Sequence, residues 1–174
     1  MNELMKIGEF FLRYPHEEIH LRELARKLKI SPYTVKKYCD KLVEEELIID
    51  HRQAHLRVFK ANNTNIYYKQ VKITQNIREI NQAGLVQEIL EKLANISSIT
   101  LYGSYAKGEN TEQSDIDIVI IGKDKPFSIQ SLPRVEAHVY SWSEWKQIAR
   151  SNKAYYIDVI QYGIALFGDI PIIK

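Results

Sequence analysis

The chain has 174 residues, of which 45% are hydrophobic and 26% charged, as expected of a folded protein with one ordinary core or two small ones. Its net charge of +2 excludes a uniformly basic surface, and its single cysteine, Cys39, excludes an internal disulfide framework. No apolar run approaches the ~20 residues that cross a bilayer, and the opening, with Glu3 and Glu9, is unlike a signal peptide. We therefore expect a cytoplasmic protein without membrane contact.

The first 61 residues are predicted to be mostly helical and to end in a short ribbon. Apolar residues recur at helical spacing within residues 3–13 and within HLRELARKLKI, residues 20–30. A third helix is predicted to start at Ser31-Pro32, because serine is a good N-cap and proline suits the first helical position. The extended runs LIID and HLRVFK follow, and residues 51–54 are the predicted hairpin tip.

Positive charge is concentrated in the second and third of these helices. Residues 20–41 contain seven Lys or Arg and two acids, a local charge of +5. On the third helix, polar and basic side chains lie opposite an apolar stripe that contains Val35, Cys39 and Leu42. The residues expected to contact double-stranded DNA are Tyr33, Thr34, Lys36, Lys37, Lys41, Arg52 and Arg57.

The segment HLRELARKLKISPYTVKKYCDKLVEEELI resembles the winged helix–turn–helix of archaeal and bacterial transcription regulators, over about the first 60 residues. The resemblance implies a recognition helix that meets phosphates and base edges in the major groove, with a wing against the DNA backbone. Glu46 is a departure, because many relatives have glycine before the wing. The alternative is a protein-interaction module whose charged face is simply solvated.

Residues 62–84 are predicted to form a linker helix between two domains. Ile66, Ile73 and Ile80 recur every seven residues, a period that suits pairing with a second helix. We therefore expect a homodimer through residues 62–83. The alternative is that this stripe packs within the chain.

Strands and helices alternate over residues 85–174. After an amphipathic segment, extended runs are predicted at 98–102, 115–121 and 133–140, helices around 142–150 and 153–162, and a last strand in GIALFG. The predicted fold class is α+β, with the helical N-terminal domain (1–61) followed by a small mixed sheet with flanking helices (85–174).

Chemistry is indicated by the segment GSYAKGENTEQSDIDIVII, residues 103–121. Two carboxylates one residue apart on a strand point to the same face, so Asp115 and Asp117 can share metal ions while Ile116 turns to the core. Gly103 lets the backbone approach a phosphate, and Ser104 offers it a hydroxyl and an N–H. Lys107 is a further candidate phosphate contact. The alternative for the aspartate pair is a strand entrance with solvated acids.

Gly103-Ser104, ten residues, then Asp115-Ile116-Asp117 is similar to the signature of the minimal nucleotidyltransferases of the polymerase β-like superfamily. The resemblance implies a nucleoside triphosphate substrate, which we expect to be ATP. It also implies a two-metal magnesium site that neutralises charge on the phosphoryl oxygens.

An active member of that superfamily needs a third carboxylate on a neighbouring strand. In RVEAHVY, alternation places Glu136, His138 and Tyr140 on one face. Glu136 lies where the family usually has aspartate, so it is the predicted third metal ligand or general base and completes the catalytic set with Asp115 and Asp117. The alternative is a surface glutamate on a half-exposed strand.

Three functions are consistent with these two motifs. The first is a magnesium-dependent nucleotidyltransferase with an attached DNA-binding domain and an unknown acceptor, which could be a protein. The second is a transcription regulator whose nucleotidyltransferase domain senses a nucleotide or is inactive. The third is the antitoxin partner of a small helical toxin, since some similar proteins transfer AMP to a toxin's tyrosine.

Overall fold

Two units make up the computed structural model, Met1–Lys72 and Ile73–Lys174. The structure describes residues 2–123 and 128–173. The boundary between the units falls inside helix α4 (Ile66–Gln82), within the segment that the sequence pattern indicates as a linker. The expected fold class, a helical N-terminal region followed by a small mixed sheet with flanking helices, is confirmed.

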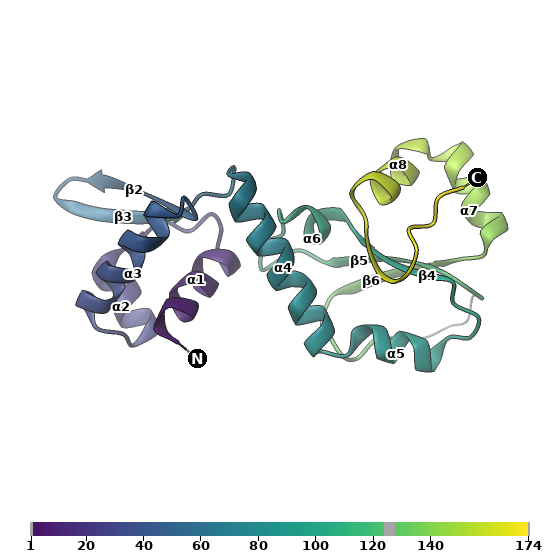
Figure 1. Cartoon of the computed structure of the whole chain (residues 1–174), viewed down its shortest axis with the longest axis horizontal. Coiled ribbons are helices and arrows are strands. Elements are labelled where there is room, and N and C mark those ends of the chain that lie inside the picture. Colours follow the sequence, from purple (N-terminus) through teal and green to yellow (C-terminus); the bar gives the residue numbers. More distant parts are fainter. Residues whose placement is uncertain (1, 124–127, 174) are drawn as a thin grey trace. The chain divides into compact units, whose positions relative to one another are not determined.

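The first unit contains three complete helices, the start of α4 and a small antiparallel sheet (Figure 1). The helices are α1 (Glu3–Arg13), α2 (Leu21–Leu28) and α3 (Pro32–Glu44). Ser31 caps α3 as expected, because its side chain accepts a hydrogen bond from the Thr34 N–H at 3.1 Å. Apolar residues from all three helices and from the sheet form one core, in which Cys39 is fully buried.

The sheet of the first unit differs from the sequence prediction at its hairpin tip. Its strands are β1 (Ile19–His20), β2 (Ile48–Gln53) and β3 (Leu56–Ala61), in the order β1-β3-β2. The sequence predicts residues 51–53 in the turn, but they pair with residues 58–56 of β3, so the tip is Ala54-His55. Ala54 lies in the left-handed region, with φ 52°, which a two-residue turn between twisted strands requires.

Helix α4 begins later than predicted. The sequence predicts helix from residue 62 onward, but β3 continues through Ala61 and α4 starts only at Ile66. The Asn65 side chain accepts a hydrogen bond from the Tyr67 N–H at 2.7 Å, which satisfies a donor at the start of the helix. Of the seven-residue stripe, Ile66 is 70% exposed, whereas Ile80 is buried in the core of the second unit.

The second unit is a four-stranded mixed sheet with helices on both faces (Figure 1). Its strands are β4 (Ser98–Tyr102), β5 (Ile116–Ile121), β6 (Val135–Tyr140) and β7 (Ile164–Gly168), in the order β6-β5-β4-β7. Strands β5 and β6 run parallel, and β4 is antiparallel to both β5 and β7. Its helices are α5 (Leu85–Lys92), α6 (Gly103–Lys107), α7 (Trp142–Ser151) and α8 (Lys153–Tyr162).

Alternation along β5 divides its side chains between two cores. Ile116, Ile118 and Ile120 pack with the residues of α5, whereas Val119 and Ile121 pack with Trp145 of α7 and Val159 of α8. Asp117 belongs by the same alternation to the face that α7 and α8 cover. Within the described residues, no helix combines the length and apolar content needed to cross a membrane.

Candidate active site and candidate DNA-binding surface

The centre of the candidate site is Asp117, the second residue of β5. In the strand register it lies opposite Tyr102 of β4 and beside Glu136 of β6. Asp115 is exposed and stands two residues before Asp117, just ahead of the strand. Sheet pairing therefore brings Asp117 and Glu136 next to each other on one face, although they are 19 residues apart in the sequence.

Gly103 shapes the site by making room for Asp117. Its φ of 68° lies in the left-handed region, and a Cβ built on it would collide with the Oδ2 atom of Asp117. Only glycine supplies both the backbone conformation and the space. Gly103 of the Gly-Ser turn and Asp117 of the aspartate pair therefore lie in close contact, although ten residues separate the two motifs in the sequence. Ser104 follows in the first turn of α6 and is half-buried.

Negative charge is concentrated around Asp117. Burial holds the pKa of its carboxyl above the usual range, the nearby Glu136 and Asp115 carboxylates raise it further, and the His138 imidazole acts in the opposite direction. This is the electrostatic setting in which a cation would be stabilised, and carboxylate oxygens are the ligands that Mg²⁺ prefers. The donor chemistry of the three acids therefore suits a divalent metal.

The three acids are not, however, gathered into a finished metal site. Among residues 2–123 and 128–173, no group of three or more His, Cys, Asp or Glu side chains is placed to hold a metal ion. Glu136 is exposed, and its Oε1 atom lies 3.1 Å from the Nε2 atom of His138, two residues along the same strand. Its carboxylate is thus engaged along β6.

Aromatic residues lie next to the acids of the site, although the sequence motifs do not assign them to it. The Tyr155 hydroxyl on α8 donates to the Tyr102 hydroxyl at 3.4 Å, and the two rings meet edge to face. The His138 ring lies edge-on to Tyr155 and stacks with Tyr140. Alternation along RVEAHVY could have placed His138 and Tyr140 here, but Tyr155 comes from a helix whose position the sequence does not reveal.

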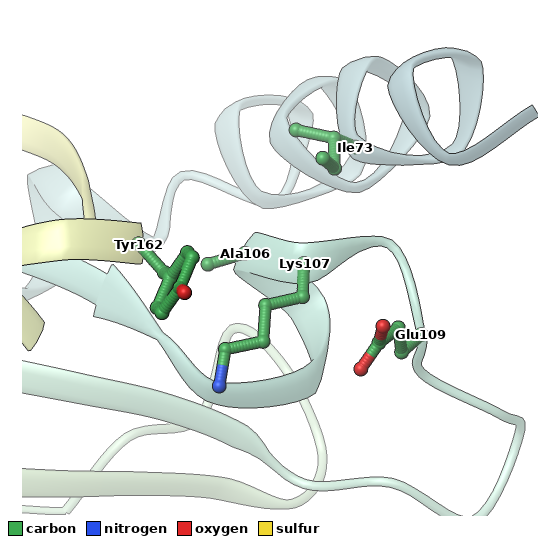
Figure 2. A pocket seen from close by; sticks show the side chains of 5 residues that line it. All are labelled: Ile73, Ala106, Lys107, Glu109 and Tyr162. Atoms are coloured by element: carbon green, nitrogen blue, oxygen red, sulfur yellow. The ribbon is translucent and has the colours of Figure 1, made fainter. Parts of the chain in front are cut away.

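Lys107, the candidate phosphate contact, is engaged with α8. Its Nζ atom lies 2.5 Å from the Asp158 carboxylate and 5.1 Å from the centre of the Tyr162 ring. Figure 2 shows Lys107 and Tyr162 in the wall of an open pocket that is also lined by Ile73, Ala106 and Glu109. Neither Asp115, Asp117 nor Glu136 is among the residues that line this pocket.

The predicted DNA-contacting residues of α3 are mostly accessible. Tyr33, Lys36, Lys37 and Lys41 are exposed, and Thr34 is half-buried beside the Ser31 cap. Two of the lysines form loose ion pairs on their own helix, Lys36 with Asp40 at 3.1 Å and Lys41 with Glu45 at 3.7 Å. Exposed ion pairs of this kind contribute little to stability, so DNA phosphates can replace Asp40 and Glu45 as partners of the two lysines.

The two arginines of the wing differ from each other. Arg52 is exposed on β2 and lies opposite Arg57 in the strand register. The guanidinium of Arg57 is held by Asp40 of α3 and Asp50 of β2, the latter at 2.6 Å. Arg57 therefore joins the wing to the helix, and a contact with DNA would compete with these two carboxylates.

Two family models match this chain. Residues 85–167 match the family described as Polymerase beta, Nucleotidyltransferase, and residues 16–49 match the family described as Winged helix-turn-helix DNA-binding. The two domain types and their order along the chain are those expected from the sequence motifs.

Curated relatives match only part of this chain. Three proteins of Methanocaldococcus jannaschii, named as candidate protein adenylyltransferases, are 44%, 31% and 42% identical over 50, 77 and 48 residues. These matches cover 29%, 44% and 25% of this chain and 48%, 60% and 48% of the relatives. The chain thus spans about half the length of the curated relatives it matches.

Solved structures resemble the chain loosely. A mutant of ZitR from Lactococcus lactis has 21% identity and a TM-score of 0.38, covering 54% of this chain and 63% of its own. A transcriptional-regulator candidate from Methanosarcina mazei has 19% identity and a TM-score of 0.37, covering 55% and 81%. At these TM-scores the similarity carries no argument about function.

Proposed function

We propose that this chain, which joins a winged helix–turn–helix DNA-binding domain to a nucleotidyltransferase domain, transfers a nucleoside monophosphate from a nucleoside triphosphate to an acceptor and releases pyrophosphate. The observation that supports the proposal best is the close approach of Gly103, in the Gly-Ser turn, to Asp117 of the aspartate pair. Gly103 is shaped around the Asp117 carboxylate, and the sheet register adds Glu136 beside it. A phosphate-compatible turn and three acids then lie at one end of one sheet.

Each residue has a separate task in this proposal. Ser104 binds the phosphate tail through its hydroxyl and N–H, while Asp115 and Asp117 hold Mg²⁺. The metal, when bound, neutralises charge that develops on the phosphoryl oxygens. Glu136 is the third ligand or the base that accepts the proton of the attacking hydroxyl. Lys107 reaches a phosphate only by leaving Asp158, so we assign it a secondary role.

The proposed nucleotide is ATP and the proposed acceptor is a protein hydroxyl. The names of the Methanocaldococcus jannaschii relatives support ATP as the donor and a protein as the acceptor, because they describe protein adenylyltransferases. The winged helix–turn–helix supports a role at double-stranded DNA, such as control of the protein's own expression. The acceptor could be a small helical toxin, in which case this chain would be its antitoxin.

The test is a transfer assay with labelled nucleoside triphosphates and Mg²⁺, with and without cell extract. Wild type should label an acceptor with ATP, and Glu136→Gln should keep nucleotide affinity while lowering transfer by ~100-fold or more, the range expected for loss of a general base. A matched control is Glu91→Gln, a change at an exposed glutamate of α5. Absence of transfer under all conditions would contradict the proposal.

A nucleotide sensor is the second candidate function. It is favoured by the engagement of Glu136 with His138, which leaves the aspartate pair without its expected third member in this arrangement. A sensor would bind nucleotide through Ser104 and the aspartates and would change DNA affinity without transfer. Metal-dependent nucleotide binding together with an unchanged triphosphate after long incubation would favour it over the enzyme.

A homodimer through residues 62–83 is also proposed. The exposure of Ile66 and Tyr67, at 70% and 48%, supports it, whereas the burial of Ile80 limits the surface to the start of α4. Sedimentation at micromolar concentration should show twice the mass of 20.4 kDa, and Ile66→Lys should restore the monomer. A monomeric wild type would contradict the dimer.

A further inference from the structure

The contact between Glu136 and His138 is the starting point for an inference that rests on the proposed function and deepens it. In the parallel register Glu136 stands beside Asp117, yet its Oε1 atom lies 3.1 Å from the His138 Nε2 atom. The described acids are correspondingly not gathered as metal ligands. We propose that His138 is a positioning residue that holds the Glu136 carboxylate apart from Asp115 and Asp117.

The His138 ring is itself fixed by aromatic neighbours. It stacks with Tyr140 at 6.3 Å between ring centres and meets Tyr155 edge to face at 6.5 Å. Tyr155 is anchored through its hydroxyl to Tyr102, the residue opposite Asp117. The imidazole therefore presents its Nε2 atom from a defined place on the same face as the acids.

The length of the Glu136 side chain allows two positions for its carboxylate. Residues i and i+2 of a strand share a face, so a glutamate can lean along β6 to residue 138 or across to the neighbouring strand. Aspartate, one methylene shorter, would reach residue 138 less easily. His138 thus determines how often the Glu136 carboxylate stays on β6 and how often it joins Asp115 and Asp117.

Three substitutions separate this role from simple packing. His138→Phe keeps an aromatic ring and removes the nitrogen that Glu136 contacts. His138→Gln removes the ring and keeps an N–H donor at similar reach. His55→Phe, at the exposed hairpin tip of the first unit, is the matched control. The same changes in a Glu136→Gln background complete a double-mutant cycle.

The measurement is calorimetric titration of the full chain with Mn²⁺ alone, a cation with the oxygen preference of Mg²⁺. His138→Phe should bind Mn²⁺ about fivefold more tightly than wild type, the size set by release of one exposed contact between side chains. His138→Gln and His55→Phe should bind like wild type, and His138→Phe should have no effect when Glu136 is replaced by Gln.

Two results would overturn the positioning role. One is Mn²⁺ affinity in His138→Phe that equals or falls below that of wild type, and the other is a gain that persists without Glu136. A wild type that binds Mn²⁺ and transfers no nucleotide would contradict the proposed enzyme. It would leave the positioning of Glu136 standing, because the titration contains no nucleotide.

Discussion

Two groups of carboxylates in this molecule differ in how their charge is balanced. In the first unit, Asp40 and Asp50 hold the Arg57 guanidinium, and the pKa of Asp40 lies below its ordinary value mainly because Arg57 donates to it. In the second unit, burial raises the pKa of Asp117, and the carboxylates of Glu136 and Asp115 raise it further.

The difference separates a structural group of carboxylates from a candidate functional group. Carboxylates that are paired with a basic side chain of the same fold stabilise it, because the fold favours their ionised form. Carboxylates that crowd together destabilise it, and such groups cluster where a ligand or metal supplies the missing charge. Asp117 is thus a candidate for function on physical grounds as well as by motif.

The largest expected effect follows from removing the crowded acids. Asp115→Asn together with Asp117→Asn should abolish Mg²⁺-dependent nucleotide binding and reduce transfer by at least ~100-fold, because both negative charges of the aspartate pair are lost and the amide oxygens that replace them are neutral. Calorimetry with ATP and Mg²⁺ measures the binding. Asp40→Asn is the matched control and should bind nucleotide like wild type. If the double variant also binds nucleotide like wild type, the acids around Asp117 are no more functional than those around Arg57.

Gly103→Ala should show how closely the turn is fitted to Asp117. Both the positive φ and the collision with the Asp117 carboxylate oppose a Cβ, so we expect a loss of about 2–3 kcal/mol in unfolding free energy. Gly84→Ala is a matched control, because Gly84 also has positive φ, at 73°, but nothing lies within 4 Å of its added Cβ. Urea unfolding should separate the two variants, and equal losses would exclude the collision.

Lysines of α3 should contribute more to DNA binding than basic residues on α7 and α8 do. Replacing Lys36, Lys37 and Lys41 by Ala should flatten the dependence of log affinity on log salt by up to ~0.9 for each phosphate that these side chains neutralise. Replacing Lys146, Arg150 and Lys153 on α7 and α8 removes the same charge elsewhere and should leave the slope unchanged. Fluorescence anisotropy with duplex DNA at several salt concentrations gives both slopes, and equal slopes in the two variants would remove α3 from the interface.

Asp40 and Asp117 should have opposite effects on stability. Asp40 has a lowered pKa in the fold, so its contribution is present above its ordinary value of 3.8 and is lost as pH falls through the lower folded value. Asp117 has a raised pKa, so its ionised form costs stability at neutral pH and the cost disappears as pH falls. At pH 7, Asp40→Asn should lower the unfolding free energy by about 1 kcal/mol, and Asp117→Asn should raise it slightly. Thermal unfolding at pH 7 and below pH 4 measures both, and changes of the same sign would contradict the comparison.

The smallest effect is expected before the wing. Glu46 has a φ of 57°, which explains why a glycine would suit this position. Glu46→Gly should raise the unfolding free energy by about 0.5–1 kcal/mol through the backbone. The gain is partly offset because the variant loses the hydrogen bond that the Asn65 amide donates to the Glu46 carboxylate. Glu45→Gly, where φ is −82°, is the control and should be destabilising. Thermal unfolding that shows a decrease in both variants would disprove the backbone explanation.

Local pattern was sufficient to predict most of the elements and the core of the candidate site. Alternation in DIDIVII separated Asp117 from Ile116 and Ile118, and the two isoleucines are buried as expected. The same rule in RVEAHVY placed Glu136 with His138, and the register shows Asp117 beside Glu136. These inferences depend only on the two-residue period of a strand, which the sequence displays directly.

Contacts between distant segments were not predictable in the same way. Arg57 is expected at DNA because it is basic and lies in the wing, but its two acidic partners come from α3 and β2. Lys107 similarly meets Asp158, 51 residues later. The predicted hairpin tip was wrong because residues 51–53 are polar on both faces, so neither hydrophobicity nor turn residues marked the end of β2.

Because β6 lies at the edge of its sheet, residue 136 can change without affecting the packing that stabilises the fold. Glu136 is exposed, and among residues 2–123 and 128–173 its strand β6 pairs with a neighbouring strand on one side only, so a change of side-chain length there disturbs no packed core. Asp117, by contrast, lies in a strand flanked on both sides and fitted against Gly103. If Glu136 is the third carboxylate, as proposed, this residue can therefore vary in natural or engineered sequences without a change in fold, and the proposed transfer rate could be adjusted there independently of thermal stability.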